Sequence, residues 1–480
     1  NNMPCPHIAA GKNLSFWPLG PLFRGAGAFF LRRTFKGAPL YAKIFSAYLE
    51  KLLWEGFNIK IFIEGGRSRT GKLLPPKPGG LAMLVNAWYS GACDNLYFVP
   101  IFVGYDHVLE EDAYLKEIEG GKKSPETLKG LISARKFLKK KYGKVYMKFN
   151  EPISVKDYAQ EKNIDISKAS SDEFITFIKS FGYKLIHSIN KNAVATPHGI
   201  IASAVLNCSS NSFTKKQMIA RVDTYMGMLS YMNAEMSDTL MIDPEYTLNS
   251  VITNFISRNF IELGDEDDHD ITENTVFIVK DNKRAVLDYY KNSVISFFIT
   301  FAYTAVAILE MDRFQFSSSD LIQRYKFLEK IFLDEFFFDE ETTFEEEISV
   351  AIKGFTSEGI LVPDSKTTDL YHVTSRGLRK LKMFAAFLQP FFESYKTTLL
   401  YFEKYEKNKH DQKERVKKIH GIGSKLFKSK VITYKESLSQ INYRNAANYF
   451  IQNGIAGSSD HIQIEYYKNI LDRLVRLINS

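Results

Sequence analysis

The sequence predicts an α/β domain, built as a mixed sheet flanked by helices, followed by a mostly α-helical domain. Up to about residue 155, short apolar β-type runs alternate with amphipathic helical segments. This alternation is typical of a sheet with helices packed on its faces. After about residue 210, long helical periodicities dominate and β-type runs become scarce. We therefore expect two domains, over residues 1–210 and 211–480.

The elements of the first domain follow from local patterns. The expected strands are runs of β-branched and aromatic residues, at 28–33, 59–63, 96–103 and 145–149. The expected helices place apolar residues three and four apart, at 40–53, 80–89 and 128–141. Ser170 and Glu173 form a plausible capping box, which predicts a further helix to about Asn190. No internal repeat is evident.

The composition is that of a folded chain in a reducing compartment. Hydrophobic residues make up 45%, which excludes disorder as the main state. Cys5, Cys93 and Cys208 lack CxxC spacing and leave an odd count, which excludes a disulfide scaffold. The sequence starts at Asn1 without a basic start and an apolar stretch. We therefore expect no signal peptide, and a chain that is processed or cut from a longer one.

One uncharged stretch, residues 292–309, bears on membrane insertion. A spanning helix needs about 20 predominantly apolar residues. This stretch is slightly shorter, includes several Asn, Ser and Thr residues, and has charged residues close to both ends. We expect a buried core helix, with a spanning helix and an interfacial helix as the alternatives.

Positive charge is concentrated at the beginning of the chain. Residues 1–80 hold twelve Lys and Arg against three Asp and Glu, whereas the whole chain has a net charge of +8. A local basic excess favours an anionic partner such as phosphate, nucleic acid or an anionic lipid surface. A solvated basic face is the alternative. Because several of these arginines lie beside glycines in apolar segments, we expect a bound anion.

The segment most informative about chemistry is F-I-E-G-G-R-S-R-T-G-K, residues 62–72, directly after an expected strand. Its three glycines permit tight turns and close approach of the backbone to a ligand. Arg67, Arg69 and Lys72 offer planar forks and a point charge suited to phosphate oxygens. Glu64 is expected to stay ionised among these cations, where it would orient an Arg or accept a bond from a substrate hydroxyl. A basic surface loop is the alternative.

This segment resembles the signature block of the glycerolipid acyltransferases, F-x-E-G-x-R-S-R-x-G-K. The resemblance is closest to the membrane-associated bacterial glycerol-3-phosphate 1-O-acyltransferases. Residues 7–33 resemble the family's second block, which ends in G-x-x-F-[IL]-x-R, and residues 99–101 resemble its proline-containing fourth block. Three blocks in the family's order make the resemblance specific, and it runs closely through residues 7–155.

The resemblance implies acyl transfer from acyl-CoA or acyl carrier protein to the sn-1 hydroxyl of glycerol 3-phosphate, giving lysophosphatidic acid, without a cofactor or metal. Dihydroxyacetone phosphate is the alternative acceptor. By position, Glu64 and Gly65 would be catalytic and Pro100 would shape the acyl-donor side. The residues implied to bind the substrate phosphate are Arg33, Arg67, Ser68, Arg69 and Lys72.

The sequence departs from the family pattern at the first block, H-x-x-x-x-D. In the family, this block's His acts as general base on the attacking hydroxyl and its Asp supports the imidazolium. The block would precede the second one, where His7 is followed five residues later by Lys12. We therefore expect the general-base pair to lie outside this sequence. The pair His107 and Asp112 fits the spacing but follows the other blocks, so we interpret it as a chance match.

The family resemblance and the charge pattern also lead to expectations about partners and to alternative functions. We expect peripheral attachment to the cytoplasmic face of a bacterial inner membrane, helped by the basic N-terminal part. The missing His/Asp block motivates a second hypothesis, a non-catalytic relative that binds a phosphate ligand. A helix, hairpin and helix over 344–388 resemble a winged helix, but the first helix is acidic, so we expect no nucleic-acid partner. The acidic run 265–270 is expected to be solvated rather than to bind a metal.

Overall fold

The computed structural model describes residues 5–32, 35, 37–66, 68–106, 108, 143–208, 210–264, 271–338, 342–455 and 457–479. Arg33, Arg67, His107, Asp112 and the expected helix at 128–141 lie outside the described residues, as does the acidic run 265–270. The described residues form two compact units. The N-terminal unit comprises those of 5–68, 73–104 and 143–193, and the helical unit comprises those of 69–72, 105–108 and 194–479. The second unit thus begins at Val194 and also takes two short segments from the first part of the chain.

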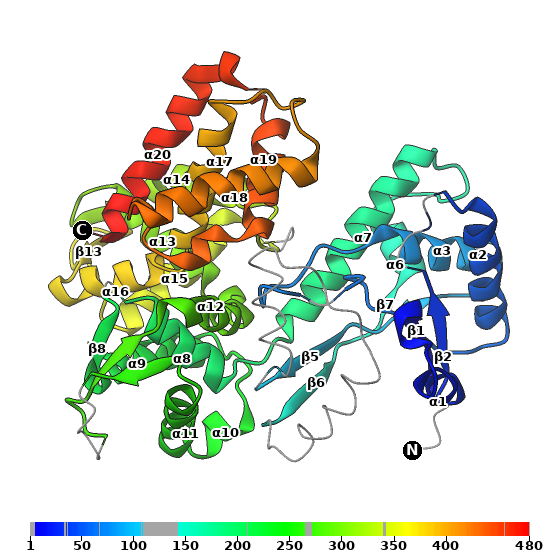
Figure 1. Ribbon diagram of the computed structural model, residues 1–480, viewed down its shortest axis with the longest axis horizontal. Helices are drawn as coiled ribbons and strands as arrows, with labels where there is room; N and C mark the ends of the chain where they lie inside the picture. The colour runs from blue at the N-terminus through cyan, green and yellow to red at the C-terminus, as the bar shows by residue number, and fades with distance from the viewer. Residues whose placement is uncertain are drawn as a thin grey trace. The chain divides into compact units, whose positions relative to one another are not determined.

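The N-terminal unit contains a small parallel sheet with the strand order β2, β1, β3, of which β1 and β2 are labelled in Figure 1. Strand β1 (His7–Gly11) pairs with β2 (Ala28–Leu31) and with β3 (Ile59–Lys60). Two further pairs are β4 (Tyr97–Phe98) with β7 (Ile153–Ser154), which is antiparallel, and β5 (Ile101–Tyr105) with β6 (Val145–Phe149). All four expected strand regions contain a strand, but the one expected at 96–103 is divided into β4 and β5, and the one expected at 59–63 ends at Lys60. Among the described residues, however, they form several small sheets rather than one mixed sheet.

Helices form at the three described positions where the sequence predicts them, and also at 19–25 and 155–161, where none was expected. They are α1 (Leu19–Gly25), α2 (Pro39–Trp54), α3 (Pro78–Tyr89), α6 (Val155–Glu161) and α7 (Ser171–Lys191). Proline opens α2 and α3, where its missing N–H has no intrahelical partner to lose. The expected capping box of α7 is present, with Ser170 and Glu173 each accepting the other's backbone N–H. Phe177, Phe181 and Leu185 of α7 then form a core with α3 and α6.

The helical unit contains the same order of elements twice. The first copy (residues 197–293) comprises α8 (Pro197–Leu206), β8 (Ser212–Thr214), α9 (Lys215–Tyr231), α10 (Asp238–Ile242), α11 (Pro244–Ser257), β9 (Ile261–Leu263), β10 (Val276–Val279) and α12 (Arg284–Ser293). The second copy (residues 295–385) comprises α13 (Ile295–Glu310), β11 (Gln315–Ser317), α14 (Ser318–Ile331), α15 (Phe344–Ser357), β12 (Leu361–Pro363), β13 (Leu370–Val373) and α16 (Ser375–Ala385). Each copy is a winged-helix arrangement, apart from the extra short helix α10 in the first.

The strand registers of the two copies are equivalent. In the first copy Phe277 lies opposite Phe213, and Val279 lies opposite Ile261. In the second copy the same positions pair Tyr371 with Phe316 and Val373 with Leu361. Both sheets are antiparallel, with the last strand of the copy in the centre.

The turns and the buried positions repeat as well. The chain leaves α11 through Asn259 and α15 through Gly359, with left-handed φ angles of 56° and 63°. Inward-facing side chains of α9 and α14 coincide, in the pairs Met218 and Leu321, Val222 and Tyr325, Tyr225 and Leu328, Met228 and Ile331, Leu229 and Phe332. The expectation of no internal repeat is therefore wrong. The repeat preserves burial and register, with few identical residues.

The remaining helices pack around α17 (Gln389–Phe402), which is buried along most of its length. They are α18 (Gln412–Lys428), α19 (Gln440–Gln452) and α20 (His461–Asn479), with a short 3-10 helix η3 (Lys435–Leu438) before α19. Ser394 and Thr398 of α17 donate their hydroxyls to carbonyls one turn back along the helix, which satisfies these polar groups inside the core.

The uncharged stretch at 292–309 forms the end of α12 and most of α13. Helix α13 is a core helix, as expected, with Phe298, Phe301 and Tyr303 inaccessible to solvent. Among the described residues, no single helix is long and apolar enough to cross a membrane. The segments Asp281–Ser293 and Ile295–Glu310 pass the length and composition criteria only together, and they are bent by 92°.

The close packing of α8 against the end of α12 in the first copy can be tested by its effect on stability. A Cβ at Gly199 would lie 2.5 Å from Val294 Cγ1 and 3.1 Å from the carbonyl oxygen of Tyr290. We expect Gly199→Ala to lower the free energy of unfolding by about 1–3 kcal/mol through overpacking. The control is Gly421→Ala on an exposed part of α18, where a Cβ meets nothing within 4 Å. In that variant the free energy of unfolding should rise by up to about 1 kcal/mol, because alanine favours a helix over glycine. Equal stability of the two variants in urea unfolding would contradict this account.

Candidate functional site

The loop after β3 is closed at its base within the N-terminal unit. The N–H of Gly65 donates to the carbonyl of Phe62 at 2.8 Å, and Gly65 has a left-handed φ of 64°. The N–H of Lys77 donates to the carbonyl of Ile63 at 2.8 Å. The loop thus starts in a tight turn that glycine adopts without strain, and its two arms meet again at Ile63 and Lys77.

The side chain of Glu64 forms a hydrogen bond across the loop. Its Oε2 accepts the N–H of Leu74 at 2.7 Å, ten residues further along the chain. Burial raises the pKa of this carboxyl, and the hydrogen bond from Leu74 offsets part of the increase. The expectation that neighbouring cations hold Glu64 ionised is therefore opposed by its burial. Its described polar contact is with the loop backbone.

The middle of the loop carries polar groups suited to a ligand. Gly65 and Gly66 are exposed, so the backbone is accessible there. The hydroxyl oxygen of Ser68 is buried and has no hydrogen-bond partner among the described residues. Arg69 is half-buried and Thr70 is buried. Ser68 in the N-terminal unit and Arg69 in the helical unit thus each carry a group that can bind an anion.

Lys72 has a different environment from the one the sequence suggested. We expected it to extend the anion pocket. In the helical unit its ammonium forms an ion pair with Glu335, and its side chain is only 5% exposed. The ammonium also lies 4.4 Å from the ring centroid of Phe391 and 5.3 Å from that of Phe336. A carboxylate and two aromatic faces therefore occupy its surroundings.

The remaining predicted residues are distributed over the two units. Pro100 is buried just before β5 in the N-terminal unit, and its carbonyl accepts the N–H of Asn150 at 2.9 Å. The structure thus places Glu64, Gly65, Ser68 and Pro100 in the N-terminal unit, and Arg69 and Lys72 in the helical unit. Arg33 and Arg67 lie outside the described residues. Within the described part of the chain, no three His, Cys, Asp or Glu side chains form a group suited to a metal ion.

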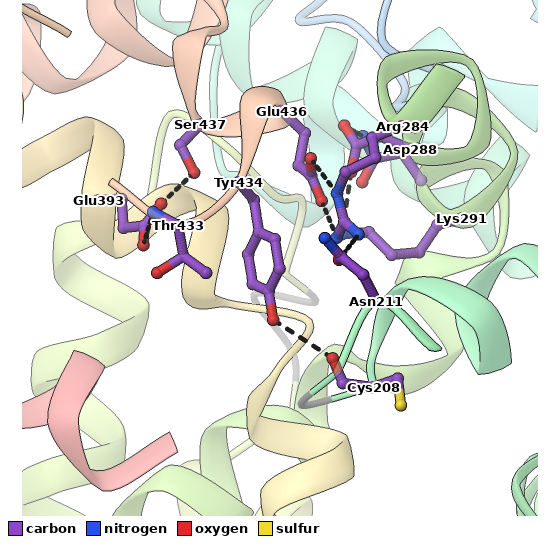
Figure 2. Close-up of polar contacts among 11 residues, drawn as sticks. Cys208, Asn211, Arg284, Asp288, Lys291, Glu393, Thr433, Tyr434, Glu436 and Ser437 are labelled. Carbon is purple, nitrogen blue, oxygen red and sulfur yellow. Dashed lines mark hydrogen bonds and ion pairs between the residues drawn. The ribbon is translucent and has the colours of Figure 1, made fainter. Parts of the chain in front are cut away.

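Sequence reasoning missed a set of buried charges on α12, drawn in Figure 2. Arg284 forms a two-point contact with Glu436, at 3.0 Å and 2.8 Å, and a further bond to Asn211 at 3.1 Å. Lys291 pairs with Asp288 at 2.9 Å. Burial by itself raises the pKa of Glu436, but the charge and hydrogen bonds of Arg284, together with the charge of Lys291 and a backbone hydrogen bond, hold this pKa below its ordinary value. Burial raises the pKa of Asp288, partly offset by Lys291.

These charges adjoin a cavity of about 240 Å³ inside the helical unit. Its lining includes Thr70 of the signature loop, Asp288 and Tyr289 of α12, and His420 of α18. The hydroxyl of Thr70 is buried there without a hydrogen-bond partner among the described residues. The spacing of Arg284, Asp288 and Lys291, at intervals of four and three, places them on one face of the helix, which the sequence could have indicated, but it does not reveal that this face is buried.

Comparison with known proteins identifies the class first. A family model described as "Acyltransferase" matches residues 1–104, which include the whole loop. A second model, described as "Glycerol-3-phosphate acyltransferase C-terminal region", matches residues 114–459, well over half of the chain. The chain therefore belongs to the glycerol-3-phosphate acyltransferase family.

Curated relatives agree with this assignment. The chain is 31% identical over 465 residues to a glycerol-3-phosphate acyltransferase of Actinobacillus pleuropneumoniae serotype 3 (strain JL03), covering 91% of this chain and 54% of the relative. It is 28% identical over 460 residues to a protein of the same name from Pasteurella multocida (strain Pm70), covering 92% and 55%. The chain spans about half the length of the curated relatives it matches.

The buried carboxyl of Glu64 predicts a pH dependence of stability. Because its pKa is raised in the folded state, the stability it contributes is present below the ordinary value of 4.5 and is lost as the pH rises through the raised pKa. Glu64→Gln cannot titrate but keeps an acceptor for Leu74. We therefore expect the Tm of the parent protein to decrease relative to the Tm of this variant as the pH is raised from about 4 to about 7. Calorimetric scans at both pH values measure it, with Glu151→Gln at an exposed position as control. A pH-independent Tm difference would contradict the prediction.

Proposed function

We propose that this protein transfers an acyl group from acyl-CoA or acyl carrier protein to the sn-1 hydroxyl of glycerol 3-phosphate, yielding lysophosphatidic acid, the first intermediate of phospholipid synthesis. The observation that carries the proposal is the loop 62–72, with its glycine turn, its cations and the unused hydroxyl of Ser68, in a chain of this family. The names of the relatives supply the acceptor. The donor and the acylated position come from the resemblance to the sn-1 acyltransferases.

The loop's groups divide the work of binding. Arg67 and Arg69 carry guanidinium groups suited to two-point contacts with phosphate oxygens, and Ser68 supplies a hydroxyl donor between them. Arg33 of the second block is assigned to the same phosphate. Binding energy from this remote phosphate positions the acceptor's hydroxyl against the thioester and so contributes to turnover.

In the chemical step, the hydroxyl oxygen forms a bond to the thioester carbonyl carbon, the carbon–sulfur bond breaks, and the thiolate leaves. In the tetrahedral intermediate between these two events, negative charge develops on the former carbonyl oxygen, and N–H donors are needed to stabilise it. Since the N–H of Gly65 already bonds to Phe62, we assign this role to the N–H of Gly66. The hydroxyl proton passes to the His of the H-x-x-x-x-D block that the resemblance implies. We assign that base to no described residue.

Substitution of Arg67 tests the acceptor assignment. We expect Arg67→Ala to raise the KM for glycerol 3-phosphate about 10- to 100-fold, as for loss of one charge-assisted contact, with little change in the KM for the acyl donor. Arg376→Ala, at an exposed position of α16, is the matched control. Unchanged KM and turnover in Arg67→Ala would refute the phosphate assignment. The same assay with dihydroxyacetone phosphate decides between the two acceptors, and absence of acylation of either would favour a non-catalytic binding role.

We further propose that the protein attaches peripherally to the inner face of a bacterial membrane, the membrane into which the acylated product would insert. Support comes from large apolar side chains exposed on and beside α1 and α2. Trp17 is 77% exposed, Leu40 71% and Ile44 60%, and Arg24, Lys43 and Lys51 are exposed near them in sequence. Apolar side chains interspersed with basic residues are typical of a surface that lies in the headgroup region of anionic lipid.

Vesicle flotation tests this attachment. We expect the parent to float with anionic vesicles at low salt and less with zwitterionic ones, because both charge and apolar burial contribute. Leu40→Glu combined with Ile44→Glu should abolish flotation. Ile462→Glu, 74% exposed on α20, should leave it unchanged. A parent protein that stays unbound at low salt would contradict the proposal.

A further inference from the structure

The end of the signature loop is enclosed by the helical unit. Lys72 pairs with Glu335, and both side chains are nearly inaccessible, at 5% and 0% exposure. The other carboxylate oxygen of Glu335 accepts the hydroxyl of Tyr395 in α17 at 3.3 Å. Burying an ion costs several kcal/mol unless it is paired, so removal of either charge leaves the other uncompensated. The pair therefore fixes Lys72 in one place.

The backbone next to Lys72 is held as tightly. Gly71 has a left-handed φ of 85°, and a Cβ built on it would lie 2.0 Å from the carbonyl oxygen of Tyr289 and 3.2 Å from the backbone nitrogen of Ser293. The loop thus lies directly against the last turns of α12. Thr70, the residue before, is only 6% exposed. Gly71 and Lys72 are therefore held by separate contacts within the helical unit, next to the buried Thr70.

The two copies differ where the loop is held. The equivalent strand positions Val279 and Val373 align α12 with α16, so that Arg284 and Lys291 correspond to Leu378 and Ala385. Both charges are buried, and buried charges are costly. The equivalent positions in the second copy are apolar. The charged inner face therefore belongs to the first copy, whose α12 lies against Gly71, and it is not a requirement of the repeated fold.

Glu335 shows the same difference. The alignment of α9 with α14 places Met232 at the position equivalent to Glu335. Since a methionine occupies this position in the first copy, the repeated fold does not require a carboxylate there. The carboxylate of Glu335 therefore serves the contact with the loop. The ion pair to Lys72 is thus a feature added to the second copy.

We propose that Lys72 and Glu335 are a positioning pair. They hold residues 69–72 within the helical unit so that Arg69 is presented to the phosphate of the acceptor, and Lys72 itself does not contact that phosphate. This inference rests on the proposed function for the identity of the acceptor. It gives the helical unit a role in substrate affinity.

A double-mutant cycle separates positioning from direct contact. The variants are Lys72→Met, Glu335→Gln and the two combined, with KM for both substrates and the dissociation constants of glycerol 3-phosphate and inorganic phosphate measured in the full chain. If the pair positions the loop, each single variant raises the KM for glycerol 3-phosphate about tenfold. The double variant, which leaves no buried unpaired charge, then returns to within about threefold of the parent. The KM for the acyl donor stays unchanged throughout.

Direct phosphate contact gives a different pattern, which would overturn the proposal. Lys72→Met would then raise the KM for glycerol 3-phosphate, Glu335→Gln would not, and the double variant would be as impaired as Lys72→Met. Should a single variant fail to fold, the double variant decides alone, because near-parent affinity supports positioning and a tenfold or greater loss refutes it. The exposed pair Lys216 and Glu273, 3.6 Å apart, provides the matched control cycle.

The proposed function and this inference fail in distinguishable ways. A parent protein that binds phosphate but acylates neither acceptor refutes the enzyme and leaves the variants' phosphate affinities to test the pair. A parent that acylates glycerol 3-phosphate, with variants indistinguishable from the control cycle, refutes the pair alone. A parent that neither binds phosphate nor acylates either acceptor overturns both.

Discussion

The structure depends on pairing charges that have been removed from water. Lys72 with Glu335, and Arg284 with Glu436, are ion pairs whose members are almost completely inaccessible. Such pairs add little net stability compared with apolar residues of the same size, but loss of one partner is severe. They therefore act as geometric constraints. The first fixes the end of the signature loop and the second joins α12 to η3, so the segments around them have one permitted arrangement.

The repeated architecture explains how such constraints are tolerated. Two copies of the same winged-helix arrangement, with equivalent registers and left-handed turns at Asn259 and Gly359, supply a large apolar core. That core can offset the cost of several buried charges. Comparison of the copies then separates what the fold requires from what has been added. Leu378 and Ala385 show that the fold needs only apolar contacts where α12 carries Arg284 and Lys291.

Local signals predicted the elements that depend on local physics. The capping box at Ser170 and the apolar stripe of α7 lie within a few turns of one another, so the sequence located that helix well. Strand β1 was not expected, because H-I-A-A-G has little β-branched character and is a strand only through pairing with β2 and β3. The repeat escaped notice because it conserves inward-facing positions such as Phe213 and Phe316 more than residue identity.

The sequence by itself indicated the family, which the comparisons confirm, and predicted a phosphate-binding loop, since the order of glycines and cations at 62–72 is chemical information that needs no partner. It could not assign roles within the loop, because these depend on which distant side chains meet each residue. Glu64 and Lys72 look alike as charged members of one motif. Only the tertiary structure showed that Glu64 bonds to the backbone of Leu74, and that Lys72 is neutralised by a carboxylate 263 residues away. Burial and long-range pairing decide what a charge does, and neither is encoded in local spacing.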